Sequence, residues 1–293
     1  MSVPGTVVGN KYRVLSPLGT GSMGAVWIAE HVDLCSQVAV KFMDPLTGDY
    51  PASRERFVRE AQAAAALRGP HVVQVFDHGF HGKIPYIVME LLEGETLRHR
   101  LNRVKRLTLR ELEQVVAQTA KAIGRAHREG FIHRDLKPDN IFLVTDDDAF
   151  FVKVLDFGLA KRIHGLGSAA TVVTDPGTML GTLHYMSPEQ IRGSSVGPAT
   201  DIWALAVVAF ECATGALPFA GRTRIHVLRD VCAGRFRLPS DCADVPPGFD
   251  AWFARAMRDG PEPPFEDARE LASGMLACTK HLPDVRCALR PPP

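Results

Sequence analysis

The stretch HRDLKPDN, residues 133–140, is the densest polar segment of the chain. Five of its eight residues are ionisable, and apolar residues flank it at 131–132 and 141–143. Charged side chains are rarely buried without partners, so this pattern predicts a polar loop held rigidly between two apolar anchors. A solvated surface turn is the alternative.

Three side chains of this loop have chemical uses. Asp135 can accept a proton from an attacking hydroxyl, Lys137 can neutralise charge on a transferred group, and Asn140 offers a neutral oxygen to a metal ion. The triplet Asp156-Phe157-Gly158 follows a predicted strand over 151–155. Its carboxylate is placed to hold Mg²⁺, with the phenyl ring packed beneath.

Further upstream, Gly19-Thr-Gly21-Ser-Met-Gly24-Ala-Val26 has the G-x-G-x-x-G spacing that lets backbone N–H groups approach phosphates. A β-type run follows it, so we expect a strand-turn-strand hairpin and not the strand-turn-helix of a dinucleotide site. An ordinary hairpin turn is the alternative. Lys41 lies on an apolar run, either snorkelling from a rim or paired with an anion, and we expect an ion pair with Glu60.

The chain of 293 residues divides into a β-rich part and a helical part. We expect strands at 25–29, 38–42, 72–76 and 86–89, with one helix at 53–67. Beyond Gly94 we expect helices at 109–129, 199–214, 223–233, 249–258 and 265–280. A small β-rich lobe should therefore precede a larger helical one.

Composition excludes several classes of protein. The net charge of +1 provides no global field for nucleic acid or an anionic membrane. The six cysteines form no C-x-x-C pair, which argues against zinc knuckles and disulfide frameworks. The longest apolar run, 202–210, is far shorter than the ~20 residues of a membrane span, and residues 1–10 lack a signal-peptide pattern. We expect a soluble cytoplasmic protein with no membrane span and no nucleic-acid partner.

In their order and spacing, these motifs together resemble the protein kinase family. The resemblance extends to Gly181-Thr-Leu-His-Tyr-Met-Ser-Pro-Glu189 and to Asp201-Ile-Trp203. Lys137 with Thr182 is the serine/threonine pattern. The sequences of residues 59–67 and 185–190 resemble the corresponding segments of the bacterial, eukaryotic-like Ser/Thr kinases.

This resemblance implies an α+β, bilobal protein-kinase-like fold: a small antiparallel β-rich N-lobe with one key helix and a larger α-helical C-lobe. It implies an N-terminal lead at 1–11 and a kinase domain at 12–281. Within the domain we expect the N-lobe at 12–89, the hinge at 90–94 and the C-lobe at 95–281. Residues 282–293 should form a disordered tail.

The family pattern also assigns roles to matching positions. The catalytic positions are Asp135, Lys137, Asn140, Asp156, Lys41 and Glu60, with Asn140 and Asp156 as metal ligands. The nucleotide-binding positions are Leu18, Gly19, Thr20, Gly21, Ser22, Met23, Gly24, Ala25, Val26, Ala39, Lys41, Met89, Glu90, Leu92 and Phe142. Phe157 and His133 should pack in one hydrophobic column.

The long polar stretch at 161–186 resembles an activation loop. Arg134, Lys161 and Arg56 are three cations that a phosphate could draw together. We therefore expect autophosphorylation, first at Thr174 and then at Thr178 or Thr171. A polar loop without any modification is the alternative.

One position departs from the family pattern. Kinases carry an arginine in the late helical region that bonds the glutamate here numbered Glu189, and Pro264 occupies its place. Either Arg269 substitutes for it, or the segment is less firmly anchored and basal activity is low.

The expected function is that of a non-specific serine/threonine protein kinase using ATP and Mg²⁺, with Mn²⁺ as an alternative metal. Its expected partners are protein substrates with Ser/Thr acceptors and a second copy of the chain, as a homodimer for trans-autophosphorylation. A pseudokinase acting as a nucleotide-binding scaffold is the main alternative, although Lys41, Asp135 and Asp156 are all present. A small-molecule kinase of similar fold is a further alternative, but the long threonine-bearing loop argues against it.

Overall fold

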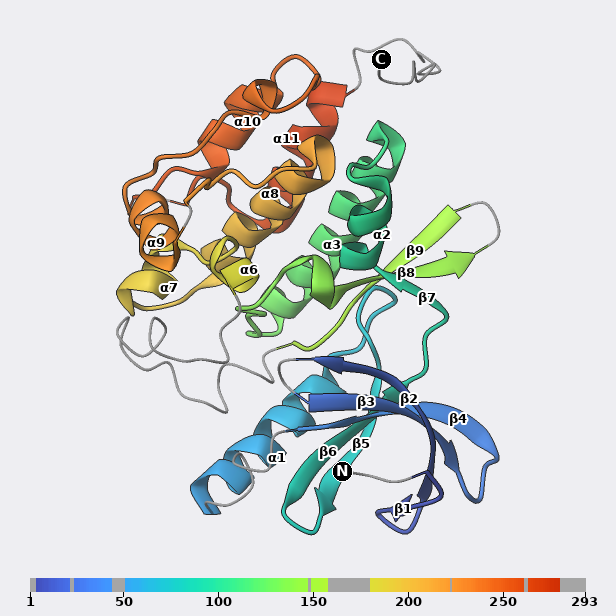
Figure 1. Cartoon of the computed structure of the whole chain (residues 1–293). Helices are drawn as coiled ribbons and strands as arrows, with labels where there is room; N and C mark the ends of the chain where they lie inside the picture. The colour runs from blue at the N-terminus through green and yellow to red at the C-terminus, as the bar shows by residue number, and fades with distance from the viewer. Residues whose placement is uncertain are drawn as a thin grey trace.

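The computed structural model describes residues 4–21, 24–43, 51–146, 149–157, 180–221, 223–260 and 263–279. Its first lobe contains one antiparallel sheet in the order β1-β2-β3-β4-β6-β5 (Figure 1). The strands are β1 Val7–Val8, β2 Tyr12–Gly21, β3 Gly24–His31, β4 Ser36–Phe42, β5 Val75–His81 and β6 Ile84–Glu90. Gly21 pairs with Gly24 across the β2–β3 turn, so the glycine motif is a hairpin, as the sequence predicted.

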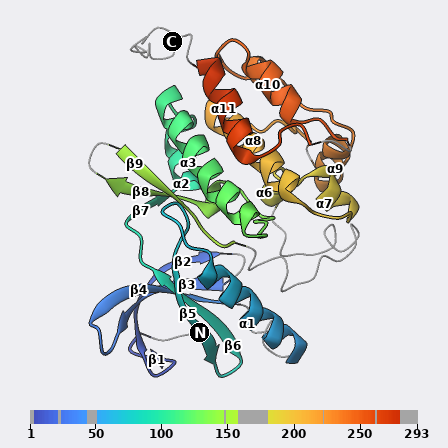
Figure 2. The same ribbon diagram turned by 180° about the vertical axis from the view of Figure 1, so that it is seen from behind.

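One helix covers this sheet. Helix α1, Pro51–Ala66, lies beside β5, as the view from behind shows (Figure 2). Phe57, Ala61 and Ala64 recur at helical spacing and are buried against the sheet. Glu60 belongs to the same inward-facing part of the helix and is only 8% exposed.

The second lobe begins with a small sheet that the sequence analysis did not predict, apart from its last strand. Its strands pair antiparallel in the order β7-β8-β9: β7 Gly94–Thr96, β8 Ile141–Asp146 and β9 Ala149–Val154. Ile141 and Leu143 point into the core of this lobe, while Phe142 is only half-buried. Alternation along β8 therefore directs Phe142 away from that core.

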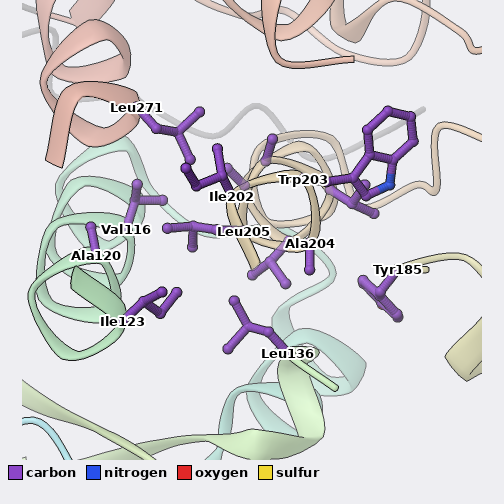
Figure 3. Close-up of a cluster of buried hydrophobic side chains, with 14 of the residues drawn as sticks. Val116, Ala120, Ile123, Leu136, Tyr185, Ile202, Trp203, Ala204, Leu205 and Leu271 are labelled. Atoms are coloured by element: carbon purple, nitrogen blue, oxygen red, sulfur yellow. The ribbon is translucent and has the colours of Figure 1, made fainter. Parts of the chain in front are cut away.

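Helices form the rest of this lobe. They are α2 Leu97–Val104, α3 Leu109–Arg128, α6 Leu180–Leu183, α7 Pro188–Arg192, α8 Pro198–Thr214, α9 Arg224–Cys232, α10 Phe249–Ala256 and α11 Ala268–Thr279, with short 3₁₀ turns at Pro138–Asn140 and Pro239–Asp241. α8 is buried on all sides between residues 200 and 212. Its side chains meet those of α3, and Leu136 of the polar loop inserts into the same cluster (Figure 3). Because Leu136 is only 1% exposed, the helical core fixes the loop that carries Asp135.

The expected strand at 72–76 is wrong at its start, since β5 begins at Val75. Val73 N–H donates to the Val154 carbonyl at 3.0 Å, and Val154 N–H donates to the His71 carbonyl at 2.9 Å. Backbone groups at 71–73 are thus bonded to the end of β9 in the other lobe and do not join the first sheet.

The last helix begins later than the expected 265. Asp267 Oδ1 accepts a hydrogen bond from Glu270 N–H at 2.8 Å, and Glu270 in turn accepts from Glu266 N–H at 2.7 Å. This reciprocal capping sets the helix start at Ala268. Across the described residues, every helix is too short or too polar to cross a bilayer.

Candidate active site

A buried carboxylate from α8 holds the polar loop. Asp201 is fully buried, and it accepts hydrogen bonds from His133 N–H and Arg134 N–H, each at 2.8 Å. His127 Nε2 in α3 lies 2.8 Å from the same carboxylate. These partners offset the several kcal/mol that burial of a lone charge costs. They also hold Arg134 at φ 66°, a left-handed conformation that a non-glycine residue adopts only when its surroundings impose it.

The loop brings its predicted catalytic residues together. Lys137 Nζ lies 2.9 Å from Asp135 Oδ2 and 3.3 Å from Thr182 Oγ1 of α6. Asn140 Nδ2 donates to the Asp135 carbonyl at 2.8 Å and lies 3.3 Å from its carboxylate. The Asp135 carboxylate is therefore held in one orientation with a cation beside it. A hydroxyl reaching Asp135 would have its transferred group close to the Lys137 ammonium.

Asp156 lies where β9 ends and adopts a left-handed conformation with φ 58°. Its carboxylate lies 2.6 Å from Lys41 Nζ on β4, and both side chains are less than one-fifth exposed. The predicted Lys41–Glu60 ion pair is wrong for this structure, because the carboxylate beside Lys41 is that of Asp156. The physical reason is that the chain turns at Asp156 just after β9, in a conformation that lets its carboxylate reach Lys41 on β4.

The ring contact predicted below Asp156 is confirmed. Phe157 and His133 meet edge to face with centroids 4.9 Å apart. His133 Nε2 also lies 2.8 Å from the Leu155 carbonyl. One imidazole thus links the polar loop to the residues on both sides of Asp156.

Asn140 and Asp156 have the chemistry of a site for a hard cation. Leu155 N–H donates to the Asn140 carbonyl at 2.9 Å, which brings the two predicted ligands close together. The Nδ2 bond to Asp135 leaves the Asn140 side-chain oxygen for a cation, and Asp156 supplies a carboxylate. The described part of the chain contains no group of three or more His, Cys, Asp or Glu residues that could hold a metal ion. A cation here would therefore complete its oxygen shell with phosphate and water.

The glycine hairpin comes close to β4. Gly24 has φ 129°, and a Cβ added there would lie 1.8 Å from the Phe42 carbonyl oxygen. Any side chain would force the hairpin away from the sheet. At Gly19 an added Cβ meets no atom within 4 Å, so that glycine borders open space. Thr20, Gly21, Ala25 and Val26 lie in the hairpin strands, while Ser22 and Met23 fall outside the described residues.

The predicted adenine-facing residues lie in three places. Ala39 and Met89 are opposite one another on β4 and β6, and Val26 and Leu92 pack against the same apolar cluster. Leu18 is half exposed on β2 and lies outside this cluster. Phe142 comes from the second sheet, where its ring lies 3.1 Å from the position that a Cβ on Gly94 would occupy.

The side chain of Glu90 has a structural role that the sequence analysis missed. Its carboxylate lies 2.6 and 2.8 Å from Lys153 Nζ of β9 and accepts a hydrogen bond from Gln74 N–H at 2.6 Å. This ion pair ties the end of β6 to the second lobe. The available sequence signal was Lys153 itself, a lysine among the apolar residues of β9. The same kind of pattern indicated an ion pair for Lys41.

The sequence pattern of the protein kinase domain matches residues 12–281. The chain belongs to the protein kinase domain family. A solved structure titled as the PknI kinase domain of Mycobacterium tuberculosis, a double mutant, superposes with a TM-score of 0.75 at 26% identity, covering 95% of this chain and 99% of that one. The fold is thus the bilobal kinase fold that the sequence predicted.

Named bacterial relatives agree with this assignment. A probable serine/threonine-protein kinase of Clostridium acetobutylicum is 33% identical over 271 residues, which are 91% of this chain and 40% of the relative. The serine/threonine-protein kinase PknB of Mycolicibacterium smegmatis is 35% identical over 276 residues, 91% of this chain and 43% of the relative. The chain spans about two fifths of the length of these relatives. Members of this family use ATP with a divalent metal ion.

Most of the regulatory positions predicted for this kinase domain fall outside the described residues. They include Lys161, Thr171, Thr174 and Thr178. Arg56 lies in α1, and its side chain is also outside the described part. Arg134 is the one cation of the predicted phosphate-pairing set whose position in the loop is described.

The glutamate expected to lack an arginine has a different partner. Glu189 on α7 accepts a hydrogen bond from Thr200 Oγ1 of α8, and that hydroxyl also lies 3.3 Å from Ser187 Oγ. Arg269 is exposed on α11. A buried threonine hydroxyl therefore takes the place that the family pattern gives to an arginine.

The segment around Pro264 is held by Arg255 of α10. Its guanidinium donates to the Pro264 carbonyl at 2.8 Å, pairs with Glu270 at 2.5 Å and lies 4.1 Å from the centre of the Phe265 ring. The connection from α10 to α11 is thus fixed by an arginine from the preceding helix.

A second network near the loop was not predicted. Arg98 of α2 lies 2.6 Å from Glu211 of α8 and 2.6 Å from the Tyr185 hydroxyl, and 3.6 Å from Asp139. Burial raises the pKa of Tyr185 well above its ordinary value, and the Glu211 charge raises it further. Tyr185 therefore stays a neutral donor to Glu211. A glutamate inside an otherwise apolar helix was the only sequence signal.

Proposed function

We propose that this chain is an ATP- and Mg²⁺-dependent protein serine/threonine kinase. The observation that carries the proposal is the cluster of Asp135, Lys137, Asn140 and Thr182, beside Asp156 and Lys41. The family membership and the names of the relatives support the same reaction.

In the proposed reaction, the hydroxyl oxygen of a serine or threonine attacks the γ-phosphorus of ATP. A new O–P bond forms, the bond from the γ-phosphorus to its bridging oxygen breaks, and ADP leaves with that electron pair. Asp135 orients the hydroxyl and takes its proton, while Lys137 stabilises negative charge on the transferred phosphoryl group.

Lys41 and the glycine hairpin would bind the phosphates of ATP, and Ala39, Met89 and Val26 would contact the adenine. Asn140 and Asp156 would hold the metal, with Mn²⁺ able to replace Mg²⁺. When bound, the ion supplies charge neutralisation and alignment of the phosphates. The part played by this chain's own residues is mainly to position the reactants in a preformed site.

Regulation is part of the proposal. We infer activation by autophosphorylation in trans, within a homodimer, at Thr174 and then at Thr178 or Thr171. We also infer a cytoplasmic location, which the free thiols of the described cysteines favour because such thiols persist in reducing compartments. Mass spectrometry after incubation with ATP tests the phosphosites, and their absence between 161 and 180 would contradict this part.

The deciding experiment is transfer of labelled γ-phosphate from ATP and Mg²⁺ to the protein itself and to a generic basic protein. We expect label on the wild type and none on Asp135→Ala, with ATP binding retained by both. If both proteins bind ATP and neither transfers label, the chain is a nucleotide-binding scaffold and not an active kinase.

A further inference from the structure

Helix α7 directly follows the segment that carries Thr182, and its polar side chains reach in different directions. Gln190 Nε2 donates to the Arg134 carbonyl at 2.8 Å, one residue from Asp135. α7 is therefore bonded to the polar loop at 133–140, which we call the catalytic loop because it carries the proposed base Asp135. Whatever fixes α7 also fixes the backbone next to the proposed base.

Arg192 anchors the other end of this helix. Its guanidinium lies 2.7 Å from the Asp259 carboxylate, in the connection from α10 to α11, and donates to the Cys232 carbonyl at 3.1 Å. Cys232 is the last residue of α9, where exposed carbonyls give the helix end a partial negative charge that a cation stabilises. We call this contact of Arg192 with Asp259 and the Cys232 carbonyl the α7 anchor.

In the α7 anchor, the acid and the arginine are exchanged relative to the ion pair of the family pattern. In that pattern the acid comes from α7 and the arginine from the later segment, at the place of Pro264. Here α7 supplies the arginine and the later segment supplies the acid, five residues before Pro264. Both arrangements join the same two parts of the chain with one charge-assisted contact.

We propose that Arg192 is a positioning residue for phosphoryl transfer to protein substrates, with Asp259 as its partner. It holds α7 through the α7 anchor, and α7 holds the catalytic loop through Gln190. This role rests on the proposed kinase function. In the proposed function most of the ATP contacts come from the glycine hairpin, Lys41, Ala39 and Met89 of the first lobe, so the α7 anchor should govern the protein substrate more than ATP.

A purely surface ion pair is the competing explanation. Both side chains of the pair are about two-fifths exposed, and pairs of this kind contribute little to stability. The experiment therefore needs readouts that a passive surface pair would not change: the KM for protein substrate against the KM for ATP, and the exchange rate of backbone amides in α7 and in the catalytic loop.

The variants are Arg192→Gln, Asp259→Asn and the exchanged pair Arg192→Asp with Asp259→Arg. Arg229→Gln is the matched control, because Arg229 is an exposed arginine on α9 that contacts only its neighbour Asp230 at 3.9 Å among the described ion pairs. We expect Arg192→Gln and Asp259→Asn to raise the KM for protein substrate about three- to tenfold and to leave the KM for ATP within about twofold. High salt should reduce the difference from wild type.

Amide exchange gives a readout that does not depend on activity. Ser194 N–H donates to the Glu189 carbonyl at 2.9 Å, so it reports on the end of α7. We expect faster exchange at Ser194 and at Arg134 in Arg192→Gln, unchanged exchange in Arg229→Gln, and partial recovery in the exchanged pair. Recovery is partial because aspartate cannot donate to the Cys232 carbonyl.

Unchanged exchange and unchanged substrate KM in Arg192→Gln would overturn the proposal. Equal rises in both KM values, or an exchanged pair no better than the single variants, would overturn it as well. If wild type transfers no phosphate, the proposed function fails, while the exchange rates still decide whether Arg192 holds the catalytic loop.

Discussion

Replacement of Asp201 by asparagine tests the anchoring of the catalytic loop most directly. The substitution keeps the shape of the side chain but leaves one oxygen in place of two. Because His133 N–H and His127 share Oδ2, the better orientation keeps the oxygen there. The new NH₂ group then faces Arg134 N–H, so two donors meet in a buried site.

The magnitude follows from these contacts. One charge-assisted hydrogen bond, worth about 1.5–3 kcal/mol, is lost, and a buried donor left without an acceptor costs about 1–3 kcal/mol. The two effects overlap, so we expect the free energy of unfolding to fall by about 3 kcal/mol. Arg134 also loses the contact that holds it in its left-handed conformation. If all of this energy serves to place Asp135, kcat falls about 100-fold.

The assay combines thermal unfolding, kcat for a protein substrate and the Kd for ATP. We expect Tm to fall by about 5–10 °C and kcat by one to two orders of magnitude, with the Kd for ATP nearly unchanged. Asp250→Asn is the control, since this more exposed carboxylate accepts bonds from Ser240 and should tolerate the change within about 0.5 kcal/mol. A Tm within about 2 °C of wild type together with a kcat within about threefold would refute the reasoning.

Three further changes give distinct outcomes. Gly24→Ala should weaken ATP binding and lower Tm, because its Cβ would overlap the Phe42 carbonyl; calorimetry showing unchanged affinity and Tm would contradict this. Lys153→Met should cost about 1–3 kcal/mol in urea unfolding, since Glu90 keeps its charge without its cation, and a smaller loss than in an exposed-lysine control would count against the bridge. Burial lowers the pKa of His71 from 6.5, so the unfolded chain takes up a proton there more readily than the folded one. Stability should therefore fall as the pH drops below about 6.5, and His71→Gln should flatten that slope.

Much of the site could be predicted because its signals are local. The loop at 133–140 concentrates charge between apolar anchors, and the glycine spacing before a β-type run specifies a hairpin. Neither feature depends on distant parts of the chain. The partner of Lys41 does depend on them, since Asp156 lies 115 residues away and reaches Lys41 from a left-handed turn after β9.

The features that the sequence missed are short or long-range. β7 contains three residues, too few for a periodic pattern. Glu211 stands out in an apolar stretch, but Arg98 is 113 residues away and nothing in the local sequence identifies it as the partner. The family pattern predicts an arginine as the partner of Glu189, whereas in the fold the Thr200 hydroxyl donates to it.

The bonding of residues 71–73 to β9 has a mechanical consequence. These residues lie between α1 and β5 in the sequence, but their backbone is joined to the helical lobe. The side chain of Val73, by contrast, packs with Phe57 and Ala61 of α1 in the apolar cluster of the first lobe. If the small sheet rotates relative to the helical lobe, this segment therefore acts as a joint, with its backbone bonded to one lobe and a side chain packed in the other. A change in the opening angle between the lobes would then act on the packing of α1, the helix that carries Glu60.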